Sequence, residues 1–208
     1  MAKVRAVLAT RNLGKVEEVA AIVGEAAEVA GLESMGIIEL PPESGATYEE
    51  NALAKARAVA RAAGVLTLAD DSGLEVDALG GEPGVRSSRY AGPSCDPVAN
   101  NEKLLRELAG VPAGERGARF VCVAALVAAD GRERLARGEV EGSIATAPRG
   151  AGGFGYDPLF IPRGHERTFA EMARSEKNRI SHRTRAFREI IRYLPDFDAR
   201  GPKLLAGD

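Results

Sequence analysis

The alternation of hydrophobic and polar residues predicts a strand followed closely by a helix at the start of the chain. Residues 3–9 alternate and are rich in valine, which is typical of a half-buried strand. Val16, Val19 and Val23 then recur at helical spacing, which predicts a helix over 15–23. The intervening residues must form a tight strand–turn–helix connection.

Similar patterns predict further strands and helices downstream. Thr47 and Glu50 form the sequence signature of a capping box, so we expect a helix over 47–63. The other expected elements are a short strand and loop at 27–42, strands at 65–69, 74–78, 120–129, 133–145 and 159–161, and helices at 97–108 and 181–194. The strands at 120–129 and 133–145 read as a hairpin, and the tail after Pro195 as loose. These elements predict an α/β protein with a mixed sheet.

Composition and charge narrow the class of protein. The chain has 208 residues, which suits a single domain, or two close lobes without a linker, over 1–208. Its net charge of −2 argues against a general nucleic-acid-binding protein. No apolar run is long enough to span a membrane, and no signal peptide is recognisable. Two cysteines make no disulfide framework, so we expect a reduced, cytoplasmic protein.

The connection after the first strand has the composition of an anion-binding turn. Helix N-termini attract anions through free N–H groups, and a lysine in the first turn adds a full positive charge. This motif is not a Walker A loop, and an ordinary strand–turn–helix connection is the alternative. The candidate phosphate-binding residues are Thr10, Arg11, Asn12, Leu13, Gly14 and Lys15.

Three acidic residues are candidates for holding a divalent cation. Glu43, Asp70 and Asp71 offer the carboxylate oxygens that Mg²⁺ prefers. Because adjacent residues of a strand point to opposite faces, one of Asp70 and Asp71 could bind metal while the other orients or deprotonates water. Ser72 adds a hydroxyl group for an anion. The alternative is a simple acidic turn, for which Asp-Asp-Ser-Gly is good composition.

Two residues of the expected helix at 47–63 extend the candidate site. Asn51 and Lys55 are four residues apart and share one helix face. Beside a triphosphate, Lys55 would be a further positive charge. The alternative is an ordinary lysine on a solvated helix surface.

A glycine-rich loop at 150–155 is a candidate for base recognition. It formally fits G-x-G-x-x-G, but a strand and not a helix follows, which excludes a dinucleotide-binding turn. We expect the loop to present Phe154 for stacking on a base, with Asp157 nearby as an acceptor. The alternative is that Phe154 belongs to the core.

Basic residues gather at the start of the last expected helix. His182 and Arg183 are donors suited to acceptor atoms on a base edge or to phosphate. Lys177, just upstream, is a further candidate for substrate contact. The alternative is that His182 is a structural histidine.

In this order the segments resemble the inosine triphosphate pyrophosphatase family, in particular its bacterial dITP/XTP pyrophosphatase branch. The resemblance covers residues 3–194 and rests on six ordered segments. These are Ala9 to Lys15; Pro42 to Gly45 with Thr47 to Ala52 and Lys55-Ala56; Ala69 to Leu74; Gly84-Val85 with Arg89 to Gly92; Gly152 to Pro158; and Ser181 to Arg183 with Ala186.

The resemblance implies a two-lobed fold with an elongated mixed β-sheet and a nucleotide cleft between the lobes. It also implies a homodimer that uses Mg²⁺ to hydrolyse ITP, dITP and XTP to the monophosphate and pyrophosphate. Neither a nucleic acid nor a membrane is expected as a partner. A catalytically silent nucleotide-binding module and a pyrophosphatase for other modified nucleotides, as in the Maf family, are the alternatives.

Residue roles also follow from the resemblance. It implies that Glu43 and Asp71 serve the metal and that Asp71 accepts the proton from the attacking water. The residues 10–15, Ser72 and Lys177 would contact the triphosphate substrate. The purine would be held by Phe154, Gly155, Tyr156, Asp157, His182 and Arg183.

Overall fold

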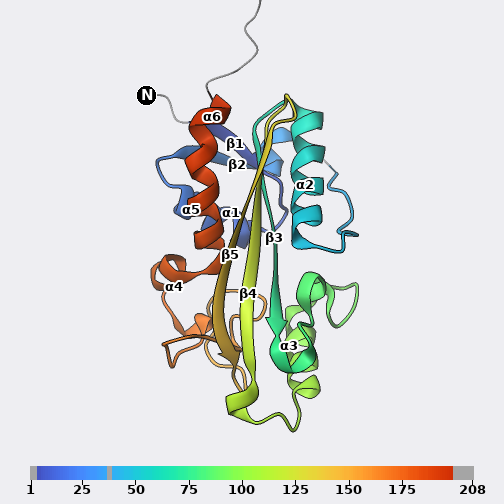
Figure 1. The fold of residues 1–208 in the computed structure, drawn as a ribbon, viewed down its shortest axis with the longest axis vertical. Coiled ribbons are helices and arrows are strands. Elements are labelled where there is room, and N and C mark those ends of the chain that lie inside the picture. The colour runs from blue at the N-terminus through green and yellow to red at the C-terminus, as the bar shows by residue number, and fades with distance from the viewer. Residues whose placement is uncertain (1–3, 37–38, 199–208) are drawn as a thin grey trace, which may run out of the picture.

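Six strands form one mixed sheet in the computed structural model, which describes residues 4–36 and 39–198 (Figure 1). The strands are β1 (Val4–Leu8), β2 (Ala27–Gly31), β3 (Thr67–Val76), β4 (Gly117–Val127), β5 (Glu133–Ile144) and β6 (Phe160–Pro162). Their order in the sheet is β2-β1-β3-β4-β5-β6. β1 runs parallel to β2 and β3, whereas the remaining neighbours are antiparallel. The predicted α/β class and mixed sheet are therefore confirmed.

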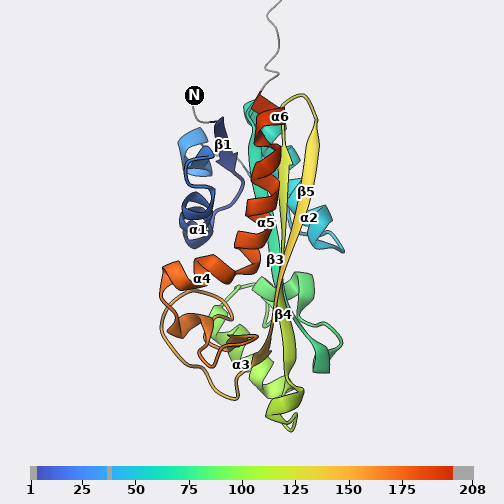
Figure 2. The same ribbon diagram turned by 60° about the vertical axis from the view of Figure 1, so that its left-hand side comes forward.

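Helices cover both faces of the long strands. They are α1 (Leu13–Val23), α2 (Tyr48–Ala63), α3 (Pro97–Glu107), α4 (Arg174–Ile180), α5 (His182–Ile190) and α6 (Leu194–Asp198). α2 lies on one face of the sheet and α5 on the other. α3 lies toward the end of the molecule that is farther from α6 (Figures 1 and 2). None of the described helices is long and apolar enough to cross a membrane.

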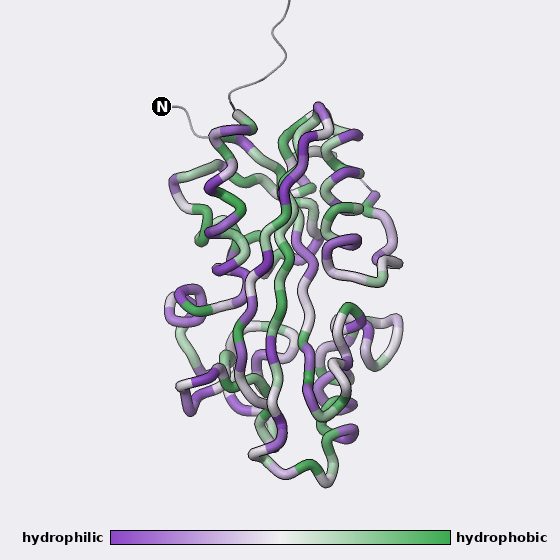
Figure 3. Tube along the Cα trace, in the orientation of Figure 1, coloured by the Kyte–Doolittle hydropathy of each residue, from purple (hydrophilic) through white to green (hydrophobic). Residues whose placement is uncertain are grey.

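The core follows from the hydrophobic pattern of the central strands. β4 is hydrophobic along much of its length (Figure 3), and Val121 to Val127 are all buried. Cys122 belongs to the cluster on the α5 face, whereas Val121 and Val123 pack with α2 on the other face. Both faces of β4 are thus covered, which explains why its sequence is a continuous apolar run rather than an alternation.

The acidic segment of β3 differs from the prediction. Two separate strands were expected at 65–69 and 74–78, with an acidic turn between them as the alternative reading of 70–73, but β3 is continuous from Thr67 to Val76. The full segment pairs with β4 in antiparallel register, with Asp71 opposite Val123. A Cβ at Gly73 would lie 2.3 Å from the carbonyl oxygen of Gly84, so glycine here permits a close approach of two backbones rather than a turn.

The C-terminal helical region is also more divided than expected. The predicted helix over 181–194 is α5, followed by a short 3-10 turn and then α6. α4, which precedes it, was missed. The chain is not loose directly after Pro195, because α6 continues to Asp198 and Phe197 is buried in the core. The rest of the predicted loose tail lies outside the described residues.

One edge of β3 is open where the acidic residues lie. β1 pairs with β3 only at Thr67 and Leu68, and the chain then turns away into α1. Side chains from both faces of β3 can therefore reach the same space along this edge. This opening is where the candidate site forms.

Candidate active site

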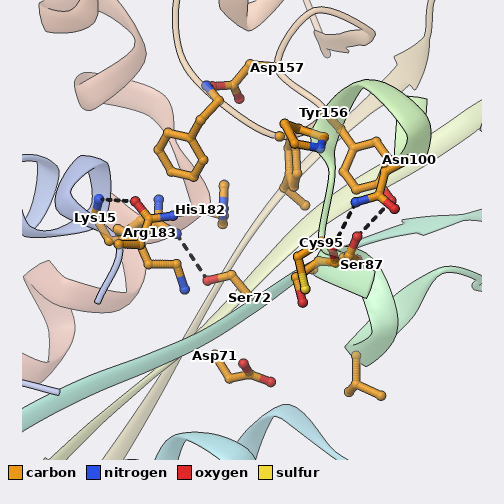
Figure 4. Close-up of a pocket in the computed structure, with 18 of the residues that line it drawn as sticks. Lys15, Asp71, Ser72, Ser87, Cys95, Asn100, Tyr156, Asp157, His182 and Arg183 are labelled. Carbon is orange, nitrogen blue, oxygen red and sulfur yellow. Dashed lines mark hydrogen bonds between the residues drawn. The ribbon is translucent and has the colours of Figure 1, made fainter. Parts of the chain in front are cut away.

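A cavity of about 370 Å³ opens along the free edge of β3 (Figure 4). It brings together side chains from α1, the loop before α2, β3, the loop after β5, α4 and α5. The predicted site residues that line it are Asn12, Lys15, Glu43, Asp71, Ser72, Phe154, Gly155, Tyr156, Asp157, Lys177, His182 and Arg183. Segments separated by up to about 170 positions in the sequence thus converge on one space.

The remaining predicted residues lie around the cavity rather than on its wall. Asn51, Lys55 and Asp70 are buried behind it. The turn predicted to bind an anion is held by its own side chains: the Thr10 hydroxyl accepts a hydrogen bond from the Asn12 N–H. Asn12 in turn caps α1 by accepting from the Lys15 N–H at 3.1 Å. The other turn residues that do not line the cavity are Arg11, Leu13 and Gly14.

Lys55 joins two of the candidate metal ligands. Its Nζ donates to Oε1 of Glu43 at 2.7 Å and to Oδ1 of Asp71 at 3.0 Å. Asn51 donates to the other Asp71 oxygen at 3.1 Å. Lys55 is 5 % exposed, so the alternative of a solvated helix lysine is wrong.

The pKa values of these two carboxyl groups move in opposite directions. Burial raises the pKa of Asp71, and the neighbouring Glu43 raises it further against the opposing charge of Lys55. Burial by itself would raise the pKa of Glu43, but the positive charge of Lys55 outweighs burial, so the pKa of Glu43 is lowered. The site therefore strengthens the proton affinity of Asp71 and weakens that of Glu43, which makes Asp71 the better candidate for accepting a proton.

Glu43 and Asp71 together fit a hard divalent cation that also binds substrate. Their oxygens lie within 3.0 Å of one lysine nitrogen, and both residues line the cavity. No group of three or more His, Cys, Asp or Glu side chains suited to a metal occurs among the described residues. Two carboxylates suffice for Mg²⁺ when substrate phosphates and water supply the other ligands.

Asp70 lies on the opposite face of β3 and has different partners. Its Oδ2 is 3.0 Å from Nζ of Lys15 and 3.2 Å from Nη2 of Arg183, and it accepts from the Ser72 hydroxyl at 2.7 Å. Burial opposes ionisation, but Lys15 and Arg183 outweigh it and hold the pKa of Asp70 well below its usual range. The structure thus separates Asp70 from Glu43 and Asp71 instead of uniting the three.

A buried glutamate that the sequence reading missed ties the basic residues together. Glu18 of α1 forms ion pairs with both Lys177 and Arg183. Lys177 also donates to Oδ2 of Asp157 at 2.6 Å. The signal available in the sequence was weak: Glu18 is next to Val19 on the face of α1 that the pattern predicts to be buried.

Phe154 is placed beside these cations at the cavity wall. Its ring centre is 4.7 Å from Nζ of Lys177 and 5.6 Å from Cζ of Arg183. The backbone N–H of Phe154 donates to Asp157, which fixes the loop. The ring is only partly buried and lines the cavity, which favours presentation to a ligand over the core alternative.

At the far end of the cavity the predicted residue Tyr156 meets residues that were not predicted. Tyr156 reaches it and donates its hydroxyl to the Ser87 carbonyl at 2.9 Å. Asn100 donates to the Ser88 carbonyl at 2.9 Å and also lines the wall. Ser87 and Ser88 belong to a 3-10 turn and Asn100 to α3, where no candidate site residue was predicted from the sequence, so only the fold identifies them.

His182 is a buried, neutral side chain at the cavity. Its ring stacks on Phe120 with centres 4.7 Å apart, and its Nδ1 has no hydrogen-bond partner in the described part of the chain. Burial and the charges of Arg183 and Lys177 lower the pKa of His182 well below its ordinary value of 6.5. A polar atom left unpaired in this way is available to a ligand.

The depressed pKa of His182 predicts a pH-dependent stability. Below pH 6.5 the unfolded chain takes up a proton on this residue that the folded chain does not, so acid favours unfolding. We expect the free energy of unfolding to fall by up to about 1.4 kcal/mol per pH unit from this group. Urea unfolding at pH 7.0 and 5.5 checks this: His182→Gln should flatten the dependence and His165→Gln, at an exposed site, should not. Equal slopes in all three proteins would contradict it.

Comparison with known proteins places this site in a family. The model of the Ham1 family matches residues 6–193. The chain belongs to the Ham1 family. A relative from Symbiobacterium thermophilum, named dITP/XTP pyrophosphatase, is 51 % identical over 199 residues, which are 94 % of this chain and 97 % of the relative. The Bacillus subtilis protein of the same name is 46 % identical, over 91 % of this chain and 96 % of that protein.

Solved structures of Ham1 proteins have the same fold. The Ham1 protein of Coxiella burnetii superposes with a TM-score of 0.83 at 38 % identity, over 93 % of this chain and 99 % of that one. The Staphylococcus aureus Ham1 protein gives 0.81 at 39 % identity, over 92 % and 98 %. The resemblance read from the six sequence segments is therefore confirmed at the level of family and fold.

Proposed function

We propose that this chain is a nucleoside-triphosphate pyrophosphatase that hydrolyses dITP, ITP and XTP to the monophosphate and pyrophosphate with Mg²⁺. Its relatives carry the name dITP/XTP pyrophosphatase. The observation that carries the proposal is that one cavity is lined both by carboxylates and by a set of aromatic and basic side chains. Glu43 and Asp71 suit a metal-bound triphosphate, while Phe154, His182 and Arg183 suit a purine.

The chain's own residues account for binding and proton transfer. Lys15, Lys55 and the α1 N-terminus place positive charge next to the phosphates. Glu43 and Asp71 would hold Mg²⁺, which when bound supplies charge neutralisation for the triphosphate and the leaving pyrophosphate. Asp71, with its raised pKa, accepts the proton of the attacking water.

The base end of the cavity supports a preference for 6-oxo purines. Hypoxanthine and xanthine carry an acceptor oxygen at C6, whereas adenine carries an amino donor. Arg183 and the single N–H of the neutral His182 ring are donors, so adenine would leave a donor unpaired at a cost of about 1–3 kcal/mol. Phe154 adds a stacking surface that any purine can use. Guanine shares the 6-oxo group, and its 2-amino group must be read by other contacts.

The predicted activity is tested by measuring pyrophosphate release with Mg²⁺ from dITP, ITP, XTP, GTP, ATP and dUTP. We expect kcat/KM for the first three to exceed that for ATP by at least about tenfold, in line with one unpaired donor. Binding without release would support the silent nucleotide-binding alternative. A preference for a pyrimidine would support a pyrophosphatase for other modified nucleotides.

We further propose that residues 1–208 act as one domain and that the enzyme is a cytoplasmic homodimer that acts on free nucleotides. The family resemblance and the net charge of −2 support this. Light scattering of the purified chain measures the oligomeric state directly. A monomer at micromolar concentration would contradict the dimer.

A further inference from the structure

The buried carboxylate of Asp70 has no access to the cavity that holds the other acidic residues. Its side chain is fully buried, and it lies on the face of β3 that packs against α1 and α5. Asp71 and Ser72 line the cavity, whereas Asp70 does not. Asp70 therefore lies behind the cavity wall, whereas Glu43 and Asp71 form part of it.

Three of the four described residues that contact this carboxylate belong to the cavity wall, and the fourth is the buried thiol of Cys122, 3.9 Å from Oδ2. Lys15, Ser72 and Arg183 each contact its Oδ2, and each also lines the cavity. The other oxygen, Oδ1, has no hydrogen-bond partner among the described residues. Asp70 thus lies directly behind three donors that face the substrate space.

We propose that Asp70 is a positioning residue for Lys15, holding the ammonium of the phosphate-binding turn against the cavity. This rests on the proposed function, because it assigns Lys15 to a phosphate chain. Lysine has a flexible four-carbon stem, and fixing it on binding costs rotamer entropy of up to about 2 kcal/mol. An ammonium has three N–H donors, so one bond to Asp70 leaves two for phosphate oxygens. Asp70 therefore prepares Lys15 for binding without using up its donors.

A comparison with and without metal separates this role from metal ligation. The probe is inorganic tripolyphosphate, which carries no base, and its Kd is measured by calorimetry in EDTA and in Mg²⁺. For Asp70→Asn we expect a rise in Kd of about tenfold in both conditions, because the ion pair that holds Lys15 in place is lost. Asp77→Asn, just beyond β3, serves as the matched control and should leave Kd unchanged. A rise confined to Mg²⁺ would overturn the proposal and return Asp70 to the metal site.

A double-mutant cycle then tests whether Asp70 acts through Lys15. Lys15→Met alone should weaken tripolyphosphate binding, and adding Asp70→Asn should weaken it by less than about twofold more. Independent, multiplying effects would refute the coupling. Should Asp70→Asn fail to fold, Asp70→Glu keeps the charge but displaces it, and the same comparison with and without metal applies. Failure of the wild type to hydrolyse nucleotides would refute the proposed function. The double-mutant cycle measures only tripolyphosphate binding, so it tests the coupling of Asp70 to Lys15 independently of hydrolysis.

Discussion

Replacing Asp71 with asparagine is expected to lower kcat for ITP by about 10²–10⁴-fold, the usual contribution of a general base. Asparagine has nearly the same shape and keeps an oxygen near Lys55, but it cannot take a proton from water. The substitution also leaves Glu43 as the remaining cavity-lining member of the proposed carboxylate pair. Nucleotide binding should largely survive, because Lys15 and the base end of the cavity are unchanged.

The measurement is steady-state pyrophosphate release alongside calorimetric binding of ITP in EDTA. Glu75→Gln is the matched control: Glu75 lies on the same face of β3 and pairs with Arg119 at the surface, 2.6 Å away. It should retain wild-type kcat. If Asp71→Asn keeps more than a tenth of wild-type kcat while folding normally, the assigned role of Asp71 is wrong.

The hydrophobic pattern predicted most of the elements because it depends on local burial. β4 and α2 each bury an extended apolar surface, and their sequences show it directly. The hairpin between β4 and β5 was confirmed for the same reason, with its turn at Asp130 and Gly131.

The prediction failed at Asp70 to Gly73, where composition indicates a turn. Adjacent carboxylates are unfavourable inside a strand unless cations meet both faces. Here Lys15 and Arg183 meet one face and Lys55 meets the other, and all three come from elsewhere in the chain. Local sequence cannot show partners that only the fold brings together. The sequence therefore identified Asp70 to Ser72 as candidate site residues but did not predict that they lie inside a continuous strand.

Glu18 illustrates the same limit within the site. It is one of several charged residues in α1, and its partners Lys177 and Arg183 lie 159 and 165 positions away. The chain of charges from Lys15 through Asp70, Arg183, Glu18 and Lys177 to Asp157 is therefore a product of tertiary structure. It links the end of the cavity proposed to hold phosphate to the end proposed to hold the base.

The second large effect is expected in stability, at the centre of that network. Arg183→Met should lower the free energy of unfolding by about 3–5 kcal/mol, the usual result of removing one partner of a buried ion pair. Arg183 is 1 % exposed and pairs with both Asp70 and Glu18. Urea unfolding measures the loss, and Arg192→Met on the exposed 3-10 turn after α5 is the control, with an expected change within about 0.5 kcal/mol.

The penalty should come from the carboxylates left behind rather than from the lost guanidinium itself. Adding Glu18→Gln to Arg183→Met removes one of those charges, so the double variant should be more stable than Arg183→Met alone. If the double variant is instead less stable, the ion pair with Lys177 is sufficient to stabilise the Glu18 carboxylate. The loss in Arg183→Met then comes from the contacts of the guanidinium itself. A purine role for Arg183 is then best examined in Arg183→Lys, which keeps a charge between Asp70 and Glu18 while altering the donors offered to the base.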